Sequence, residues 1–198
     1  MNSIDICNMA LSFLNCGRIN SLDEMTKEAK QCKINYDHLR RRLLRMYPWG
    51  FAGKIGKLAL LDERAPGYAY AYAYPEDCLA LRFVFDEEHA GNRWESRQDF
   101  SVSQLGMVGR VVLTDVAIAY ADYTADIKGP EEFSEEFIDA LAHLLASALA
   151  MVMTGNTELQ SIHLQLAQQA VDLARYQDAT ERERRTRYPH QYSDARFI

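Results

Sequence analysis

The spacing of apolar residues changes twice along this chain, and these changes constrain the fold more than any other feature of the sequence. From residue 3 to about residue 47, apolar side chains recur every three or four positions, which predicts amphipathic helices. From about 54 to 128 the spacing shortens toward two, which is typical of strands. After residue 129 the helical spacing returns. The sequence therefore predicts helices, then a sheet-like region, then helices.

The first helical region contains two predicted helices. Residues 3 to 16 carry one apolar stripe, and Gly17 is expected to act as the glycine C-cap. A capping box at residues 21 to 24 is expected to precede a second, longer helix. This helix should end near Tyr47, because Pro48 disfavours helical geometry in the residue before it. Most of its faces outside the apolar stripe are basic and are expected to be exposed: Lys27, Lys30, Lys33, Arg40, Arg41, Arg42 and Arg45.

The middle region is expected to form strands. Alternation over residues 79 to 85 predicts a strand with Leu79, Leu81, Phe83 and Phe85 on one face. Three further strands are predicted at 93–102, 110–114 and 116–123. Tyrosines also alternate with alanines just before the first of these strands, so in an extended chain their phenols would all project from one side: Tyr68, Tyr70, Tyr72 and Tyr74.

The second helical region opens at Ser134, a plausible N-cap followed by acidic residues that suit the positive end of a helix dipole. Gly155 and Asn156 are expected to end this helix. Thr157 and Gln160 match a second capping box, and the last helix is then expected to run to about residue 183. Its expected core stripe consists of Leu159, Ile162, Leu166, Leu173 and Tyr176.

These elements predict an α+β fold that is mainly α. Its core would be an antiparallel bundle of about four helices, interrupted by a small β-rich insertion and followed by an extended C-terminal arm. The bundle would take residues 1–53 and 130–183, the insertion 54–129 and the arm 184–198. The arm has no apolar period that could bury a face, so we expect it to become ordered only against a partner.

Composition indicates a folded, soluble protein with four reduced cysteines. Its formal net charge of −6 means that the surface as a whole should repel nucleic acid. No stretch approaches the roughly 18 apolar residues of a membrane span, and the N-terminus has no basic region followed by an apolar run. We therefore expect a protein that is made and kept in the cytoplasm, without a membrane anchor. The cysteines show no CxxC spacing: Cys7, Cys16, Cys32 and Cys78.

Signals of catalysis are weak. A glycan hydrolase would need two carboxylates at a set separation, and the acidic pairs Glu76–Asp77 and Glu131–Glu132 are ordinary at turns and helix starts. The five histidines have no metal-ligand spacing, and the sequence contains no glycine-rich phosphate loop and no nucleophile elbow. We expect no catalytic residue, no metal and no cofactor.

An ordered set of short motifs resembles one known family. It begins with Ser21-Leu22-Asp23-Glu24 and continues with Ala29, Cys32 and Tyr36, then with residues 44–52 (LRMYPWGFA) and residues 67–79 (GYAYAYAYPEDCL). The succession is similar to the tail tubular protein A, or head–tail adaptor, family of podophages, over most of residues 1–182.

The resemblance implies a structural role in the tail or neck of a virion. The chain would assemble in the host cytoplasm as a ring of about twelve copies beneath the portal protein. It would attach the tail tube or nozzle protein, and double-stranded DNA would pass through its lumen. A strongly negative ring would repel the DNA rather than hold it. Two other interpretations are open: a tail-associated peptidoglycan hydrolase, and a monomeric cytoplasmic interaction domain.

Two groups of residues are candidates for contacts in such a ring. Trp49 and Phe51 could anchor a neighbouring subunit, or could instead fill the junction between the second helix and the β region. The tyrosine run could line a subunit seam or the inner wall, or pack against the bundle. The arm is expected to dock on the portal, where several linked contacts would strengthen each other, unless it is a solvated tail. Its candidate contact residues are Arg184, Arg185, Arg187, Tyr188, Tyr192 and Phe197.

Overall fold

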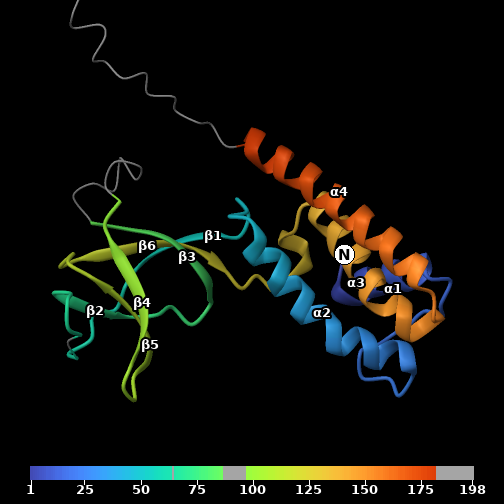
Figure 1. Cartoon of the computed structure of the whole chain (residues 1–198), viewed down its shortest axis with the longest axis horizontal. Coiled ribbons are helices and arrows are strands. Elements are labelled where there is room, and N and C mark those ends of the chain that lie inside the picture. The colour runs from blue at the N-terminus through green and yellow to red at the C-terminus, as the bar shows by residue number, and fades with distance from the viewer. Residues whose placement is uncertain (64, 87–96, 182–198) are drawn as a thin grey trace, which may run out of the picture.

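The computed structural model describes residues 1–63, 65–86 and 97–181, and it contains a helical unit and a β unit side by side (Figure 1). The helices are α1 (Ser3–Phe13), α2 (Lys27–Met46), α3 (Glu135–Thr154) and α4 (Thr157–Glu181), with a 3-10 turn, η2 (Pro130–Glu132), before α3. The strands are β1 (Gly53–Lys57), β2 (Tyr70–Ala73), β3 (Cys78–Asp86), β4 (Phe100–Leu105), β5 (Gly109–Thr114) and β6 (Ala119–Ala125).

The central helix of the helical unit is α3, which packs against α1, α2 and α4. Among the described residues, it is also the one helix long and apolar enough to cross a membrane, so the expectation that no stretch approaches that length is wrong. About half of its most apolar window, 56%, is buried inside the protein. Because α3 packs against three other helices, its apolar composition is that of a core helix.

The face of α4 that packs against α3 differs from the predicted stripe. The buried residues are His163, Ala167, Val171 and Ala174. Small side chains on both helices allow a close approach, in which the Ser147 hydroxyl of α3 donates to a backbone carbonyl oxygen of α4 at 2.9 Å. The larger apolar residues predicted as the core stripe are therefore mostly exposed: Ile162, Leu166, Leu173 and Tyr176.

Helix ends in the first half of the chain also differ from the predicted ones. Asn15, with a φ of 54°, takes the left-handed conformation after α1, two residues before the expected Gly17. The side chain of Thr26 caps α2 by accepting from the Ala29 amide at 3.3 Å. The residues predicted as its capping box instead form a turn, in which Glu24 accepts from the Ser21 amide at 3.0 Å. A capping box is a local signal, and it stabilises this turn without starting the helix.

The cap of α4 is Asn156 rather than Thr157. The Asn156 side-chain oxygen accepts from the amides of Glu158 and Leu159 at 2.8 and 3.2 Å. It follows Gly155, which ends α3 with a φ of 68°. The α3–α4 turn therefore joins a glycine C-cap directly to an asparagine N-cap.

This cap gives a first testable prediction. Asn156→Ala should lower the free energy of unfolding by about 1 kcal/mol, because two amides at the start of α4 lose their acceptor. Thr157→Ala should change it by less than about 0.5 kcal/mol, since Thr157 is exposed. Urea unfolding of the two variants measures both values. An equal loss in both would contradict the assignment of the cap.

The β unit consists of two three-stranded antiparallel sheets, in the orders β1-β6-β3 and β2-β5-β4. Leu60 bridges Tyr72 at one edge, and Val84 bridges Gln98 at the other, so the two sheets are connected on both sides. Side chains from both sheets share one buried cluster that includes Val84, Val112 and Ala121. The six strands therefore enclose a core of their own, and this arrangement leaves few open strand edges.

The predicted fold class, mainly α with a small β insertion, is wrong. Of the residues that the structure describes, helices hold 46% and strands 23%, in two sheets, so the fold is mixed α/β. One cause is β1, which was not predicted because its sequence, GKIGK, is almost entirely exposed and has no apolar alternation. The strand predicted at residues 79–85 is present as β3, although register shifts between Cys78 and Ala80 and between Leu81 and Phe83 interrupt its alternation.

Candidate interaction surfaces

A buried ion pair joins the helical unit to the β unit. The Arg40 guanidinium of α2 donates to the Asp126 carboxylate at 2.6 Å and to the Ile127 carbonyl oxygen at 2.5 Å, just after β6. Arg40 also contacts Asp37 at 3.1 Å, and its side chain is only 2% exposed. The expectation that Arg40 belongs to the exposed basic face is therefore wrong. Because both ions are withdrawn from water, their geometry fixes how the two units meet.

Trp49 and Phe51 fill the same junction. Trp49 is 1% exposed, and its indole N–H donates to the Leu43 carbonyl oxygen at 2.9 Å. Its ring meets the Phe137 ring edge to face at 5.3 Å, and Phe51 packs on Phe137 at 5.1 Å. A side chain buried to this extent has no surface for a neighbouring subunit. The structure thus places Trp49 as a plug between α2, α3 and the β unit, the second of the two interpretations.

The tyrosine run does not present four phenols on one face. Tyr72 is buried, and its hydroxyl donates to the Val116 carbonyl oxygen at 2.6 Å. Tyr70 and Tyr74 are half-buried and pack against the same cluster as Tyr72, whereas Tyr68 packs against a different one. The strand spans only Tyr70–Ala73, so Tyr68 and Tyr74 lie outside it and do not follow the alternation of its two faces. They pack within the β unit rather than against the bundle.

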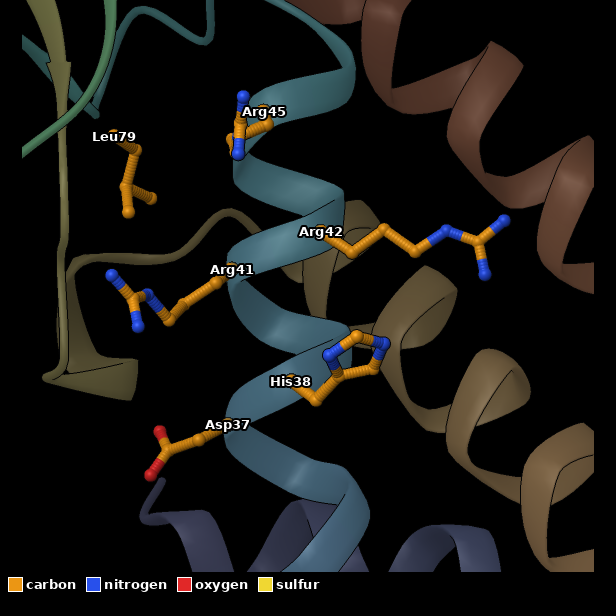
Figure 2. A pocket seen from close by; sticks show the side chains of 6 residues that line it. All are labelled: Asp37, His38, Arg41, Arg42, Arg45 and Leu79. Carbon is orange, nitrogen blue, oxygen red and sulfur yellow. The ribbon is translucent and has the colours of Figure 1, made fainter. Parts of the chain in front are cut away.

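An open groove lies between α2 and the β unit, with a volume of about 690 Å³. We call it the basic groove; it is lined by Asp37, His38, Arg41, Arg42, Arg45 and Leu79. In Figure 2, Arg41 extends from α2 toward the side of Leu79, whereas Arg42 extends to the other side of the helix. Leu79 belongs to β3 and supplies the apolar wall.

The charge of this groove is largely uncompensated. Arg41 lies 3.3 Å from the Asp126 carboxylate. Within the described part of the chain, neither Arg42 nor Arg45 forms a salt bridge, and both are exposed. Arg45 lies near Tyr74, where burial raises the pKa of the Tyr74 hydroxyl to about 12 and the arginine charge acts against that rise. An acidic or aromatic partner would find two guanidinium groups here without a salt bridge in the described part of the chain.

A second surface lies on α4. We call it the α4 seam; it consists of Leu159, Ile162, Leu166, Gln169, Leu173 and Tyr176, spaced by three and four residues in turn. Ile162, Leu173 and Tyr176 are 43%, 52% and 69% exposed. The spacing is that of a helix that packs along another helix, and none of the six residues is charged. The folded chain leaves the stripe from Ile162 onward largely in solvent, whereas Leu159 packs partly against the core.

Two histidines meet where α1, α3 and α4 come together. His143 of α3 and His163 of α4 face each other with their Nδ1 atoms 3.2 Å apart, and the Phe13 ring stacks on both. Burial lowers the pKa of His143, the nearby His163 lowers it further, and Asp139 raises it. In this contact one Nδ1 donates and the other accepts, as the tautomers of the two rings determine.

This pair predicts a pH dependence of stability. The pKa of His143 is lower in the folded chain than in the unfolded one, so the unfolded chain binds a proton more readily. Stability contributed by neutral His143 is present above the unfolded pKa of 6.5 and decreases as the pH falls below it. The melting temperature should fall between about pH 7.5 and pH 5.5. His143→Phe should reduce that fall; identical pH profiles for both proteins would contradict the assignment.

Of the carboxylates suggested for glycan cleavage, Asp77 is held by two donors. Asp77 accepts from the Lys54 ammonium at 2.5 Å and from the Tyr123 hydroxyl at 2.9 Å. The hydrogen bond from Lys54 lowers the pKa of Asp77, whereas a general acid requires a raised one. Glu131 and Glu132 are exposed in η2. Within residues 1–63, 65–86 and 97–181, no cluster of three metal-ligating side chains occurs.

The predicted portal-binding residues, Arg184 to Phe197, lie outside the described residues. Sequence reasoning missed the seam as a surface because its apolar residues were assigned to the core. It also missed the groove, which combines α2 with a β strand distant in sequence. Comparison of the chain with models of protein families finds no match, and comparison with curated proteins finds none either.

Proposed function

We propose that this chain is a virion structural protein, the head–tail connector of a podophage. It would form a ring of about twelve copies beneath the portal, hold the tail tube or nozzle protein, and surround the DNA channel. Its motifs resemble the tail tubular protein A family. Residues 44–52 of that set lie at the junction between the helical and β units. The proposal includes portal docking by residues 184–198.

The observation that carries the proposal is the exposed α4 seam. Four large apolar side chains on one regular stripe stay 37% to 69% exposed, and covering them would be favourable by about 25 cal/mol for each Å² of apolar surface removed from water. A contiguous exposed apolar stripe often marks a contact with another protein chain. The basic groove provides a second, chemically different surface. Two distinct surfaces are what a ring subunit needs to contact two neighbours.

The hydrolase interpretation has less support. Asp77 is held ionised by Lys54, and the open groove beside α2 is lined by arginines rather than by paired carboxylates. A glycosidase site requires one protonated and one ionised carboxyl group on either side of a sugar bond.

The test is the mass of the portal ring of the same virus, measured by light scattering after it is mixed with this chain. The full chain and a version that ends at Glu183 are compared. We expect many copies of the full chain to bind, and far fewer copies of the truncated one, because the arm supplies the docking contacts.

Two other results would change the proposal in different ways. Equal uptake of both versions would keep the connector role and move the portal contact from the arm into the folded part. Uptake of neither version would contradict the connector role, and assays of peptidoglycan cleavage would then decide the alternative.

A further inference from the structure

The α4 seam and the basic groove are complementary in chemistry. We propose that the seam of one copy docks into the groove of a second copy, head to tail. The inference rests on the proposed function, because it assigns this contact as the lateral interface of the ring. The partner is therefore another copy of the same chain.

The two helices that carry these surfaces differ in charge. The α4 sequence contains four acidic residues and one basic residue, and the α2 sequence contains seven basic residues and two acidic ones. Between Glu158 and Asp172, α4 has no charged residue at all. An uncharged stripe bounded by acidic residues therefore faces a groove in which Arg42 and Arg45 are unpaired within the described chain. Contact between them would pair opposite charges at the rim and exclude water at the centre.

The side chains on the two surfaces are also suited to contact each other. Arginine stems can cover apolar surface while their guanidinium groups reach a carboxylate. Tyr176, 69% exposed at the end of the seam, offers an aromatic face to such a group. Ile34, four residues before His38 on α2, is 67% exposed and extends the groove with an apolar side chain. Interfaces between proteins are enriched in these residue types.

The two surfaces occupy different places on the molecule. Both α2 and α4 pack against α3 (Figure 1). The groove opens beside α2, and the seam lies on a face of α4 other than its buried one, so the two surfaces are distinct. A contact between two different surfaces is heterologous, and each added copy leaves one seam and one groove free for the next. Such a contact closes into a ring when the rotation from copy to copy divides a full turn, as the proposed function requires, and otherwise extends into a filament. A contact of seam with seam would stop at two copies and leave both grooves empty.

Two variants of the full chain separate these possibilities. In the seam variant, Leu166→Glu and Leu173→Glu place carboxylates on the stripe and leave the groove intact. In the groove variant, Arg42→Glu and Arg45→Glu reverse the charge of the groove and leave the seam intact. The matched control is Leu164→Glu. Leu164 is 54% exposed on the same helix, and it points about 200° around the axis from Ile162.

Sedimentation equilibrium of the free proteins, up to about 1 mM, measures their self-association. We expect the wild type and the control to associate, and each double variant alone to remain monomeric. An equimolar mixture of the two variants should form a one-to-one complex that does not grow, because only one intact seam and one intact groove remain. Circular dichroism and melting temperature confirm that the variants fold.

Three results would overturn this inference: a mixture that stays monomeric, a groove variant that dimerises alone through its seam, or a wild type that stays monomeric to about 1 mM. Failure here is separate from failure of the connector role. A chain that binds the portal ring in many copies without this contact keeps the proposed function. A chain that forms the mixed complex and does not bind portal keeps only the contact.

Discussion

Replacing Arg40 by alanine should lower the free energy of unfolding by about 3–5 kcal/mol, as expected when one partner of a buried ion pair is removed. Arg40 is held by Asp126 and Asp37 and by the Ile127 carbonyl oxygen, at 2.5 to 3.1 Å. The Asp126 side chain is 15% exposed, so its charge would lose its closest partner with little water to replace it. Denaturant unfolding measures the loss.

The control for this prediction is Arg42→Ala, two residues along the same helix. Arg42 is exposed, so its removal should change stability by no more than about 0.5 kcal/mol. The double variant Arg40→Met, Asp126→Leu should be more stable than Arg40→Ala, because it removes both charges and fills the volume. If Arg40→Ala were as stable as Arg42→Ala, the ion pair would not connect the two units.

The second large effect is expected at Trp49. Trp49→Ala should lower the free energy of unfolding by about 3–5 kcal/mol, because it opens a cavity among Leu43, Phe51 and Phe137 and removes an indole hydrogen bond. Trp49→Phe should retain most of the stability, since a ring still occupies the space. The measurement is again denaturant unfolding of the isolated chain.

This experiment also separates the two interpretations of Trp49. A residue that anchors a neighbouring subunit would leave the isolated chain unchanged when removed and would weaken only assembly. Tyr176→Ala provides the comparison, because Tyr176 is 69% exposed and its loss should cost the isolated chain less than about 0.5 kcal/mol. Unchanged stability in Trp49→Ala would contradict its position as a junction plug.

The helices could be placed from the sequence because apolar periodicity is a local property. The residues that cap the helices could not be placed in the same way, as Thr26 and Asn156 show. Each is the observed cap, although a capping box at other residues was predicted. The serine and glutamate of the first box form a turn instead. Which of several polar residues caps a helix depends on the path of the chain before it, and that path is set by tertiary contacts.

The buried face of α4 could not be predicted for a related reason. Periodicity identifies the stripe with the largest apolar residues, and that stripe includes Leu166 and Leu173. The face that is buried depends on the partner helix, and α3 offers buried alanines such as Ala146 and Ala150. Close packing selects the alanines of α4 in place of its leucines. The mismatch between pattern and burial leaves an apolar stripe exposed on α4.

The β unit was underestimated because its strands are defined by their neighbours. Gly53 to Lys57 has no strand pattern of its own and becomes β1 by pairing with β6 along its whole length. The connection of the two sheets depends on the bridges Leu60–Tyr72 and Val84–Gln98. Such long-range pairing leaves no periodic trace in a single sequence.

The central claim is that the chain forms the ring between portal and tail, and electron microscopy of its complex with the portal ring tests it most directly. The account predicts a second ring, coaxial with the portal, with one copy of this chain per portal subunit and an open axial channel. A portal ring that stays bare at saturating protein, or that binds scattered copies without a coaxial ring, would contradict it.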